Sequence, residues 1–124
     1  MMLLLDTHVV IWWFTDDPTL ADDIKDQLDR DPGVHLSPIS LWEIGIKQAT
    51  GKLKGPDDLV ERIRRSGFKE LPITADHAIV AARLPMIHRD PFDRMLIAQA
   101  QHEGSTIVTR DAEIRKYEVS ILPV

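Results

Sequence analysis

The chain has 124 residues, a formal net charge of −5 and no cysteine. This length predicts a single domain, spanning residues 1–124, that can bury a substantial core. The absence of cysteine excludes disulfide bonds and thiolate metal sites, and the acidic balance argues against a protein that binds nucleic acid through a basic surface.

Apolar runs alternate with amphipathic stretches from the start of the chain, which predicts an α/β domain with a parallel sheet. The first apolar run is stopped by Asp6 and is too short for a secretion signal or a membrane span, so we expect a cytoplasmic protein. In the first half of the chain we expect strands at residues 2–5 and 34–36, and helices at 7–14, 20–29 and 37–51.

The second half continues the same alternation. Proline and glycine mark most of the boundaries, and Thr74 and Asp90 are expected N-caps. We expect helices from 55–57 to about 67, from 74 to before 85, and from 90 to 104, with an extended segment at 68–72. A strand at 106–109, a helical turn from Asp111 and a strand near 119–122 complete the chain.

Four acidic residues stand where apolar side chains are expected, namely Asp6, Glu43, Asp93 and Asp111. Asp6 and Asp111 follow predicted strands, and in parallel sheets sites form at the carboxyl ends of the strands. Glu43 and Asp93 interrupt apolar helix patterns, in what we expect to be first turns. We expect no cationic partner for any of the four. Because clustered carboxylates repel one another, the pattern predicts a bound divalent cation.

Helix capping is a simpler explanation for some of these acids. Asp6 and Asp111 can each cap the segment that follows, although Thr7 can cap the first helix instead and leave the Asp6 side chain free. Asp90 directly precedes Pro91, so we favour a capping role for Asp90.

The two acids on helices have different alternatives. Glu43 stands three residues after Ser40, as in a capping box, but Ser37 before Pro38 is the better helix start. Asp93 begins a helix that is apolar nearly all round. The helix dipole explains an acid in this turn but not one on the apolar stripe, whereas metal ligation explains both.

Histidine and aromatic residues give weaker signals. None of the five histidines has the paired spacing of a zinc site, so we expect each to be a surface or packing residue: His8, His35, His77, His88 and His102. The run Trp12-Trp13-Phe14 puts three rings on one short helix. We expect one face to join the core, but not all three rings, and the excess suggests a partner surface or an ordinary core cluster.

Four segments together resemble the PIN-domain ribonucleases, in particular the VapC-type toxins of bacterial toxin–antitoxin pairs. They are Leu3-Leu4-Leu5-Asp6-Thr7-His8, Ser40-x-Trp42-Glu43-Ile44, Asp90-Pro91-Phe92-Asp93-Arg94 with the helical residues up to Ala100, and Ile107-Val108-Thr109-Arg110-Asp111. The resemblance covers essentially the whole length. It implies a three-layer α/β/α domain with a small, mostly parallel central sheet, and Mg²⁺- or Mn²⁺-dependent cleavage of RNA in an acidic pocket.

By this resemblance, Asp6, Glu43, Asp93 and Asp111 are the catalytic, metal-binding acids. Thr109 matches the small hydroxyl residue beside the last acid, while the part of Asp90 in catalysis is left open. The implied partners are an RNA substrate, a second copy of the chain and a cognate antitoxin. We expect an antitoxin helix on residues 7–14 and 20–29, with an Arg or Lys in the acidic pocket.

Three other functions are alternatives to an RNA-cleaving toxin. A metal-dependent DNA nuclease is the nearest, because the metal chemistry acts on the phosphate and not on the base. A catalytically silent interaction module of the same fold is disfavoured by the presence of all four acids. A signalling receiver domain needs an acid pair after the first strand and a late lysine, whereas Asp6 stands alone.

Overall fold

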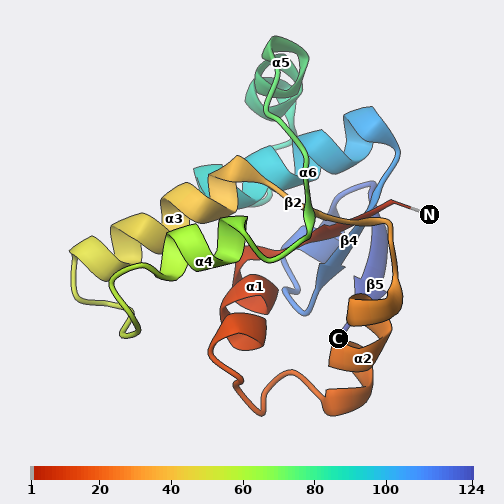
Figure 1. Cartoon of the computed structure of the whole chain (residues 1–124). Helices are drawn as coiled ribbons and strands as arrows, with labels where there is room; N and C mark the ends of the chain where they lie inside the picture. Colours follow the sequence, from red (N-terminus) through yellow and green to blue (C-terminus); the bar gives the residue numbers. More distant parts are fainter. Residues whose placement is uncertain (1) are drawn as a thin grey trace.

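A five-stranded sheet runs through the computed structural model of the chain, which describes residues 2–124 (Figure 1). The strands are β1 (Leu3–Leu5), β2 (Val34–Leu36), β3 (Lys69–Glu70), β4 (Thr106–Thr109) and β5 (Ser120–Pro123). Their order is β3-β2-β1-β4-β5 and every pairing is parallel. The chain leaves β1 toward β2 and later returns to its other side as β4, so the β1–β4 pair is the point where ligands bind in such sheets.

Helices cover both faces of this sheet. They are α1 (Thr7–Phe14), α2 (Asp22–Arg30), α3 (Pro38–Ala49), α4 (Leu59–Arg64), α5 (Ala75–Arg83) and α6 (Pro91–Glu103), with a 3-10 turn η1 (Ile114–Lys116). Leu3 and Leu5 of β1 join a core cluster with residues of the first four helices, whereas Leu4 joins a second cluster with α6 and η1. Figure 1 shows α1 and α2 on the side of the sheet away from α5 and α6. The three-layer α/β/α prediction is confirmed.

Local sequence explains where the element bounds differ from those expected. The Asp17 side chain accepts hydrogen bonds from both the backbone N–H and the hydroxyl of Thr19, and this turn delays the start of α2 to Asp22. The helix expected from 55–57 to 67 is the shorter α4. Thr74 caps α5, and Asp90 caps α6 through hydrogen bonds from the backbone N–H groups of residues 92 and 93, as predicted.

The three rings of the aromatic run on α1 all pack against the core, so the expectation that one or more would be left over is wrong. Phe68, just before β3, provides the extra apolar surface. Its ring meets those of Trp13 and Phe14 edge-on, at centroid distances of 5.5 and 6.2 Å. Trp12, Trp13 and Phe14 are all half-buried.

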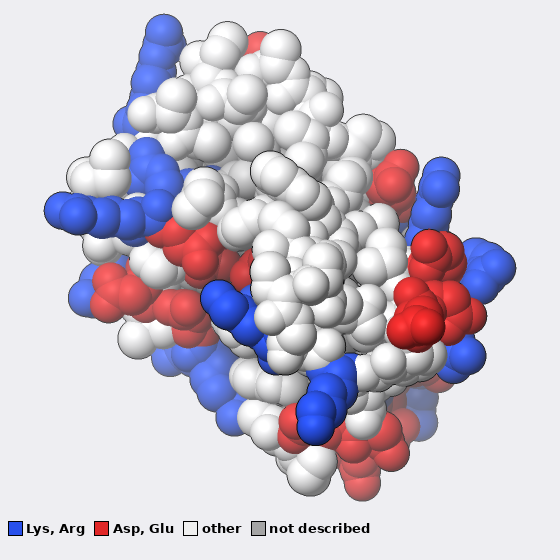
Figure 2. Space-filling model, turned by 90° about the vertical axis from the view of Figure 1, so that its left-hand side faces the viewer, with Lys and Arg blue, Asp and Glu red and all other residues white. Residues whose placement is uncertain are grey.

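Charged side chains are unevenly distributed. On the face in Figure 2, acidic and basic groups lie side by side around a broad uncharged area, and the upper part, at the level of α5, carries few acids. No helix within residues 2–124 has the length and apolar character needed to cross a membrane.

Candidate active site

Asp6 and Thr109 meet at the carboxyl edge of the sheet because the register of two parallel strands places them there. Leu5 of β1 pairs with Val108 of β4, so the next residue of each strand reaches the same edge. The Thr109 hydroxyl donates a 2.6 Å hydrogen bond to Oδ2 of Asp6, and both residues are buried. Thr109 Oγ1 also accepts from the backbone N–H of Asp111 at 3.0 Å. One hydroxyl therefore links the first and the last predicted acid.

Asp6 is also the N-cap of α1, since its Oδ1 accepts from the backbone N–H of His8 at 3.3 Å. The prediction that Thr7 would cap this helix is wrong, because Thr7 is already its first helical residue. The Thr7 hydroxyl instead hydrogen-bonds to that of Ser40 at 2.9 Å, a buried contact between α1 and α3. The hydrogen bond to Asp6 raises the pKa of His8 above its ordinary value despite partial burial, with the charges of Asp6 and Glu43 adding to the effect.

Asp111 caps the turn that follows it. Its Oδ1 accepts from the backbone N–H groups of Glu113 at 2.7 Å and Ile114 at 3.4 Å. The capping alternative is therefore correct for this residue, as it is for Asp6. The Asp111 cap uses Oδ1 only, so Oδ2 is left able to bind a cation, whereas both oxygens of Asp6 accept hydrogen bonds and a cation would share them.

Asp93 lies in the first turn of α6, as expected, and is only 5% exposed. Burial raises its pKa to about 6, and the negative charges of Asp6 and Asp90 add to this effect against the opposing hydrogen bond with His88. That bond joins His88 Nε2 to Asp93 Oδ2 at 2.7 Å. Partial burial disfavours the His88 cation, but the contact with Asp93 and the charges of Asp111 and Asp90 leave its pKa raised.

Glu43 is 8% exposed and lies in the second turn of α3, not in the first turn as expected. Ser37 caps this helix by accepting from the backbone N–H of Ile39 at 3.1 Å, which excludes a capping box at Ser40. Oε2 of Glu43 lies 3.4 Å from Nζ of Lys47. Oε1 is buried and has no hydrogen-bond partner within residues 2–124. A buried carboxylate oxygen without a partner is costly, and a bound cation would remove that cost.

The charges of Asp6, Glu43 and Asp111 each raise the pKa of a titratable group in the same part of the molecule. The charge of Asp6 contributes to the raised pKa of Asp93, that of Glu43 acts on His8, and that of Asp111 acts on His88. A cavity of about 230 Å³ is lined by Asp6, His8, Trp12, Arg110 and Asp111. Within residues 2–124, the tight group that contains one of these acids is His88, Asp90 and Asp93, whose ligand atoms all lie within 4.8 Å of one another.

Two of the four acids have basic partners. The expectation that the acids lack cationic partners is wrong for Glu43, which pairs with Lys47, and Asp93 has a basic histidine partner. The spacing of Lys47 four residues after Glu43 is a signal that sequence offers. His88 has no such signal, because it lies in the loop between α5 and α6 where no helical period relates it to Asp93.

Arg94 holds this loop in place. Its guanidinium is buried and donates to the backbone carbonyls of Ala81, Leu84, Pro85 and His88 at 2.9 to 3.2 Å. A planar group with five N–H donors suits such a set of carbonyls. Arg94 therefore fixes the backbone that carries His88.

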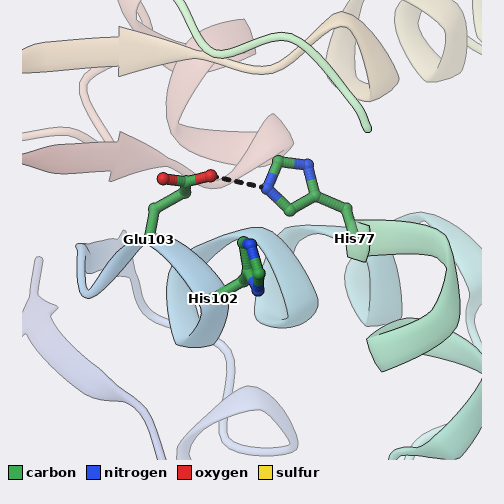
Figure 3. A group of neighbouring side chains, drawn as sticks. All are labelled: His77, His102 and Glu103. Atoms are coloured by element: carbon green, nitrogen blue, oxygen red, sulfur yellow. Dashed lines mark hydrogen bonds and ion pairs between the residues drawn. The ribbon is translucent and has the colours of Figure 1, made fainter. Parts of the chain in front are cut away.

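A second histidine–carboxylate cluster lies between α5 and α6 and comprises His77, His102 and Glu103 (Figure 3). His77 Nδ1 accepts from the backbone N–H of Thr74 at 3.0 Å, so Nε2 carries the proton and donates to Glu103 at 2.9 Å. A metal-bound histidine needs a free lone pair on one nitrogen and donates through the other. His77 donates through Nε2 but has no free lone pair, because Nδ1 already accepts from Thr74, so the cluster is a clamp between two helices and not a metal site.

Known proteins are similar to this chain over most of its length. The sequence model of the PIN domain family matches residues 3–119. Ribonuclease VapC22 of Mycobacterium tuberculosis is 28% identical over 93% of this chain and 91% of its own length. A VapBC2 structure from Rickettsia felis, bound to a promoter DNA fragment, has a TM-score of 0.79 at 17% identity, and covers 100% of this chain and 99% of the matched chain. DNA-bound VapBC from Salmonella typhimurium gives 0.77 at 18% identity, with 99% and 98% covered. These matches confirm the family resemblance, and the chain belongs to the PIN domain family.

Proposed function

We propose that the chain is a metal-dependent endoribonuclease toxin that hydrolyses phosphodiester bonds in RNA and is inhibited by a cognate antitoxin. The observation that carries the proposal is the burial of three carboxylates, Asp6, Glu43 and Asp93, with one Glu43 oxygen that has no hydrogen-bond partner within residues 2–124. The similar chain from M. tuberculosis is named a ribonuclease. Structures of the same fold are described as toxin–antitoxin complexes.

The donor set fits a hard divalent cation. Asp6, Glu43, Asp93 and Asp111 would hold Mg²⁺ or Mn²⁺, since these ions prefer carboxylate oxygens. Burial is the main cause of the raised pKa of Asp93, and the charges of Asp6 and Asp90, which add to it, are negative charge that a cation would neutralise. When bound, such an ion acts as a Lewis acid on the phosphodiester and offsets the charge that develops during its cleavage.

The protein's own groups orient these ligands and handle the proton. Thr109 holds the Asp6 carboxylate, Lys47 holds one oxygen of Glu43, and His88 holds one oxygen of Asp93. Either Glu43 or Asp111 accepts the proton of the attacking water. The products carry 5′-phosphate and 3′-hydroxyl ends.

The antitoxin belongs to the same proposal. An Arg or Lys of the antitoxin enters the cavity lined by Asp6, His8, Trp12, Arg110 and Asp111, where it displaces Arg110 from the Trp12 ring and competes with the metal ion for the carboxylates. Trp12 offers apolar surface beside the carboxylates. The exposed acids of α2 extend the same side of the molecule with negative charge. A second copy of the chain and the antitoxin together complete the assembly.

The test is incubation of the purified chain with total RNA, in Mg²⁺ or in EDTA, followed by sequencing of the cut ends. Single-stranded and duplex DNA are incubated in parallel. We expect Mg²⁺-dependent cuts with 5′-phosphate ends in RNA and none in DNA. Cleavage of DNA alone would replace the proposal with a DNA nuclease, and no cleavage of either would support a silent binding module.

A further inference from the structure

The loop that leads into α6, residues 85–90, has little apolar packing of its own. Met86 is 71% exposed and Ile87 is 40% exposed. A cavity of about 520 Å³ lies beside the loop and has Pro85 and Ile87 in its wall. Apolar burial therefore contributes little to holding this loop, although it carries the histidine that bonds to Asp93. A segment with so few buried contacts keeps its position through polar contacts.

Tyr117, far from this loop in the sequence, fastens it through its hydroxyl group. The hydroxyl donates a 2.8 Å hydrogen bond to the backbone carbonyl of Pro85, and it accepts one of 2.8 Å from the backbone N–H of His88. A hydroxyl group has one proton to donate and lone pairs with which to accept, so the two bonds use it in both directions. One side chain thus joins the two ends of the turn formed by residues 85–88.

The packing of Tyr117 does not explain its hydroxyl group. The side chain is 6% exposed, and its ring belongs to a core cluster with Leu4 and Leu96, where a phenylalanine ring would also fit. A buried hydroxyl group costs free energy unless it is hydrogen-bonded. Within residues 2–124, each of its partners lies in the loop or is Arg94, which itself binds the loop.

The fastened backbone leads directly to the acidic site. Tyr117 binds the backbone N–H of His88, and the guanidinium of Arg94 binds the backbone carbonyl of the same residue at 3.2 Å. With both backbone groups held, the imidazole is directed at Asp93, where Nε2 lies 2.7 Å from Oδ2. A group that bonds to a ligating carboxylate orients it for the metal, so the position of this imidazole matters to the site.

We propose that Tyr117 is a positioning residue of the acidic site, whose hydroxyl group holds His88 on Asp93 and so fixes that carboxylate for metal binding and RNA cleavage. The part that concerns metal and RNA rests on the proposed function. Without the hydroxyl group the ring stays in the core, but the loop is free to move toward the cavity. The loss therefore falls on metal binding and not on the affinity for RNA.

The alternative is that the hydroxyl group of Tyr117 only stabilises the fold. In that case Tyr117→Phe is less stable, but the folded protein has normal activity. Gln101 offers a matched control. Its Nε2 donates to the backbone carbonyl of Glu118 at 3.1 Å, so it ties α6 to the residue next to Tyr117 through a hydrogen bond that does not involve the loop.

The first experiment measures RNA cleavage over a range of Mg²⁺ concentrations, at a temperature where all variants are folded. Tyr117→Phe should raise the Mg²⁺ concentration for half-maximal rate by about 3- to 10-fold, as expected for one lost supporting hydrogen bond, with an unchanged KM for RNA. Gln101→Ala should match the wild type. In the His88→Ala background, Tyr117→Phe should have no further effect, because residues that act through one contact are not additive. A wild-type Mg²⁺ requirement in Tyr117→Phe, or an undiminished effect without His88, overturns the inference.

The second experiment does not depend on cleavage. In NMR spectra of the metal-free wild type, the proton on Nε2 of His88 should give a downfield imidazole signal, which His88→Ala identifies by its loss. Gln101→Ala should keep this signal and Tyr117→Phe should lose it. The corresponding signal of His77, at the other end of α6, should stay in every protein that keeps this residue and serves as internal reference.

The inference is overturned if the His88 signal persists in Tyr117→Phe or is missing from the wild type. If the wild type cleaves no RNA, the proposed function fails instead, and the imidazole signal still decides whether Tyr117 holds His88 in place.

Discussion

Helix α6 has a carboxylate near each end that bonds to a histidine from outside the helix, and the two pairs have different surroundings. At its start, His88 bonds to Asp93 at 2.7 Å, and at its end His77 bonds to Glu103 at 2.9 Å. Asp93 is buried among other acids and its pKa is raised. At the other end the histidine is the buried partner, both of its nitrogens are bonded, and the side chain of Glu103 is 34% exposed.

The His88–Asp93 pair therefore has the surroundings of a functional contact, and the His77–Glu103 pair those of a structural one. A pair whose donors and acceptors all match stabilises the fold and needs nothing further. A pair set among surplus negative charge costs stability and is relieved by a cation or a proton.

Removal of divalent cations should have the largest effect, and only at the Asp93 end of α6. EDTA should reduce RNA cleavage by about 100-fold or more, because a bound metal supplies several kcal/mol of transition-state stabilisation. Added Mg²⁺ or Mn²⁺ should restore it. Cleavage assays at fixed RNA concentration measure both, and full activity in EDTA would exclude a metal-dependent site.

Asp93→Asn keeps the size of the side chain and removes one charge from the crowded region. We expect loss of RNA cleavage and weaker metal binding. Relief of like-charge repulsion should leave the metal-free protein equally stable or more stable, by about 0.5–2 kcal/mol, in urea unfolding. Asp90→Asn is the matched control and should keep more activity, since asparagine also caps helices well. A strongly destabilised Asp93→Asn protein would indicate a structural role.

Replacing each histidine by alanine should affect a different property, namely stability for His77 and RNA cleavage for His88. His77→Ala removes a buried ring, half of a capping box and the bond to Glu103, and should cost about 2–4 kcal/mol of unfolding free energy. His88→Ala should cost about 1 kcal/mol or less, because its side chain is partly exposed. Under conditions in which both variants are folded, only His88→Ala should show altered RNA cleavage and metal affinity. The reverse pattern would assign the functional role to the helix clamp.

A smaller effect is expected in the pH dependence of the metal-free protein. The pKa of Asp93 rises from its ordinary 3.8 to about 6 in the folded state, so folding favours the protonated form. This contribution is complete below about pH 4 and is lost as the pH rises through 6, and the raised pKa of His88 acts in the same direction. Urea unfolding in EDTA at pH 5 and pH 7.5 should show a fall of about 0.5–2 kcal/mol. Asp93→Asn should reduce this fall, whereas an undiminished fall would place its origin elsewhere.

Sequence patterns predict the parts of this molecule that depend on strand order and helix period. Asp6 and Asp111 could be placed at one sheet edge because parallel strands share a carboxyl side, and Thr74 and Asp90 could be recognised as caps. The start of α3 at Pro38 is also predictable, but Glu43 lies five residues after it and therefore in the second turn, not the first.

Tertiary contacts account for what could not be predicted. The aromatic run on α1 is covered by Phe68, more than fifty residues later in the chain. Arg94 organises the loop before α6 through backbone carbonyls, which carry no sequence signal. His88 reaches Asp93 only because this loop is folded back.

The hydrogen bond between Asp6 and Thr109 joins residues 103 positions apart, and it has a consequence for the growing chain on the ribosome. β4, the neighbour of the central strand β1, is made after β2 and β3, and Asp93 and Asp111 lie on either side of it in the sequence. An incomplete chain lacks half of the proposed acids and the hydroxyl that orients the first. Contacts between distant parts of a chain also form slowly. The proposed acidic site is therefore assembled only after residue 111 has been made, and its formation depends on the pairing of β1 with β4 across all the intervening helices.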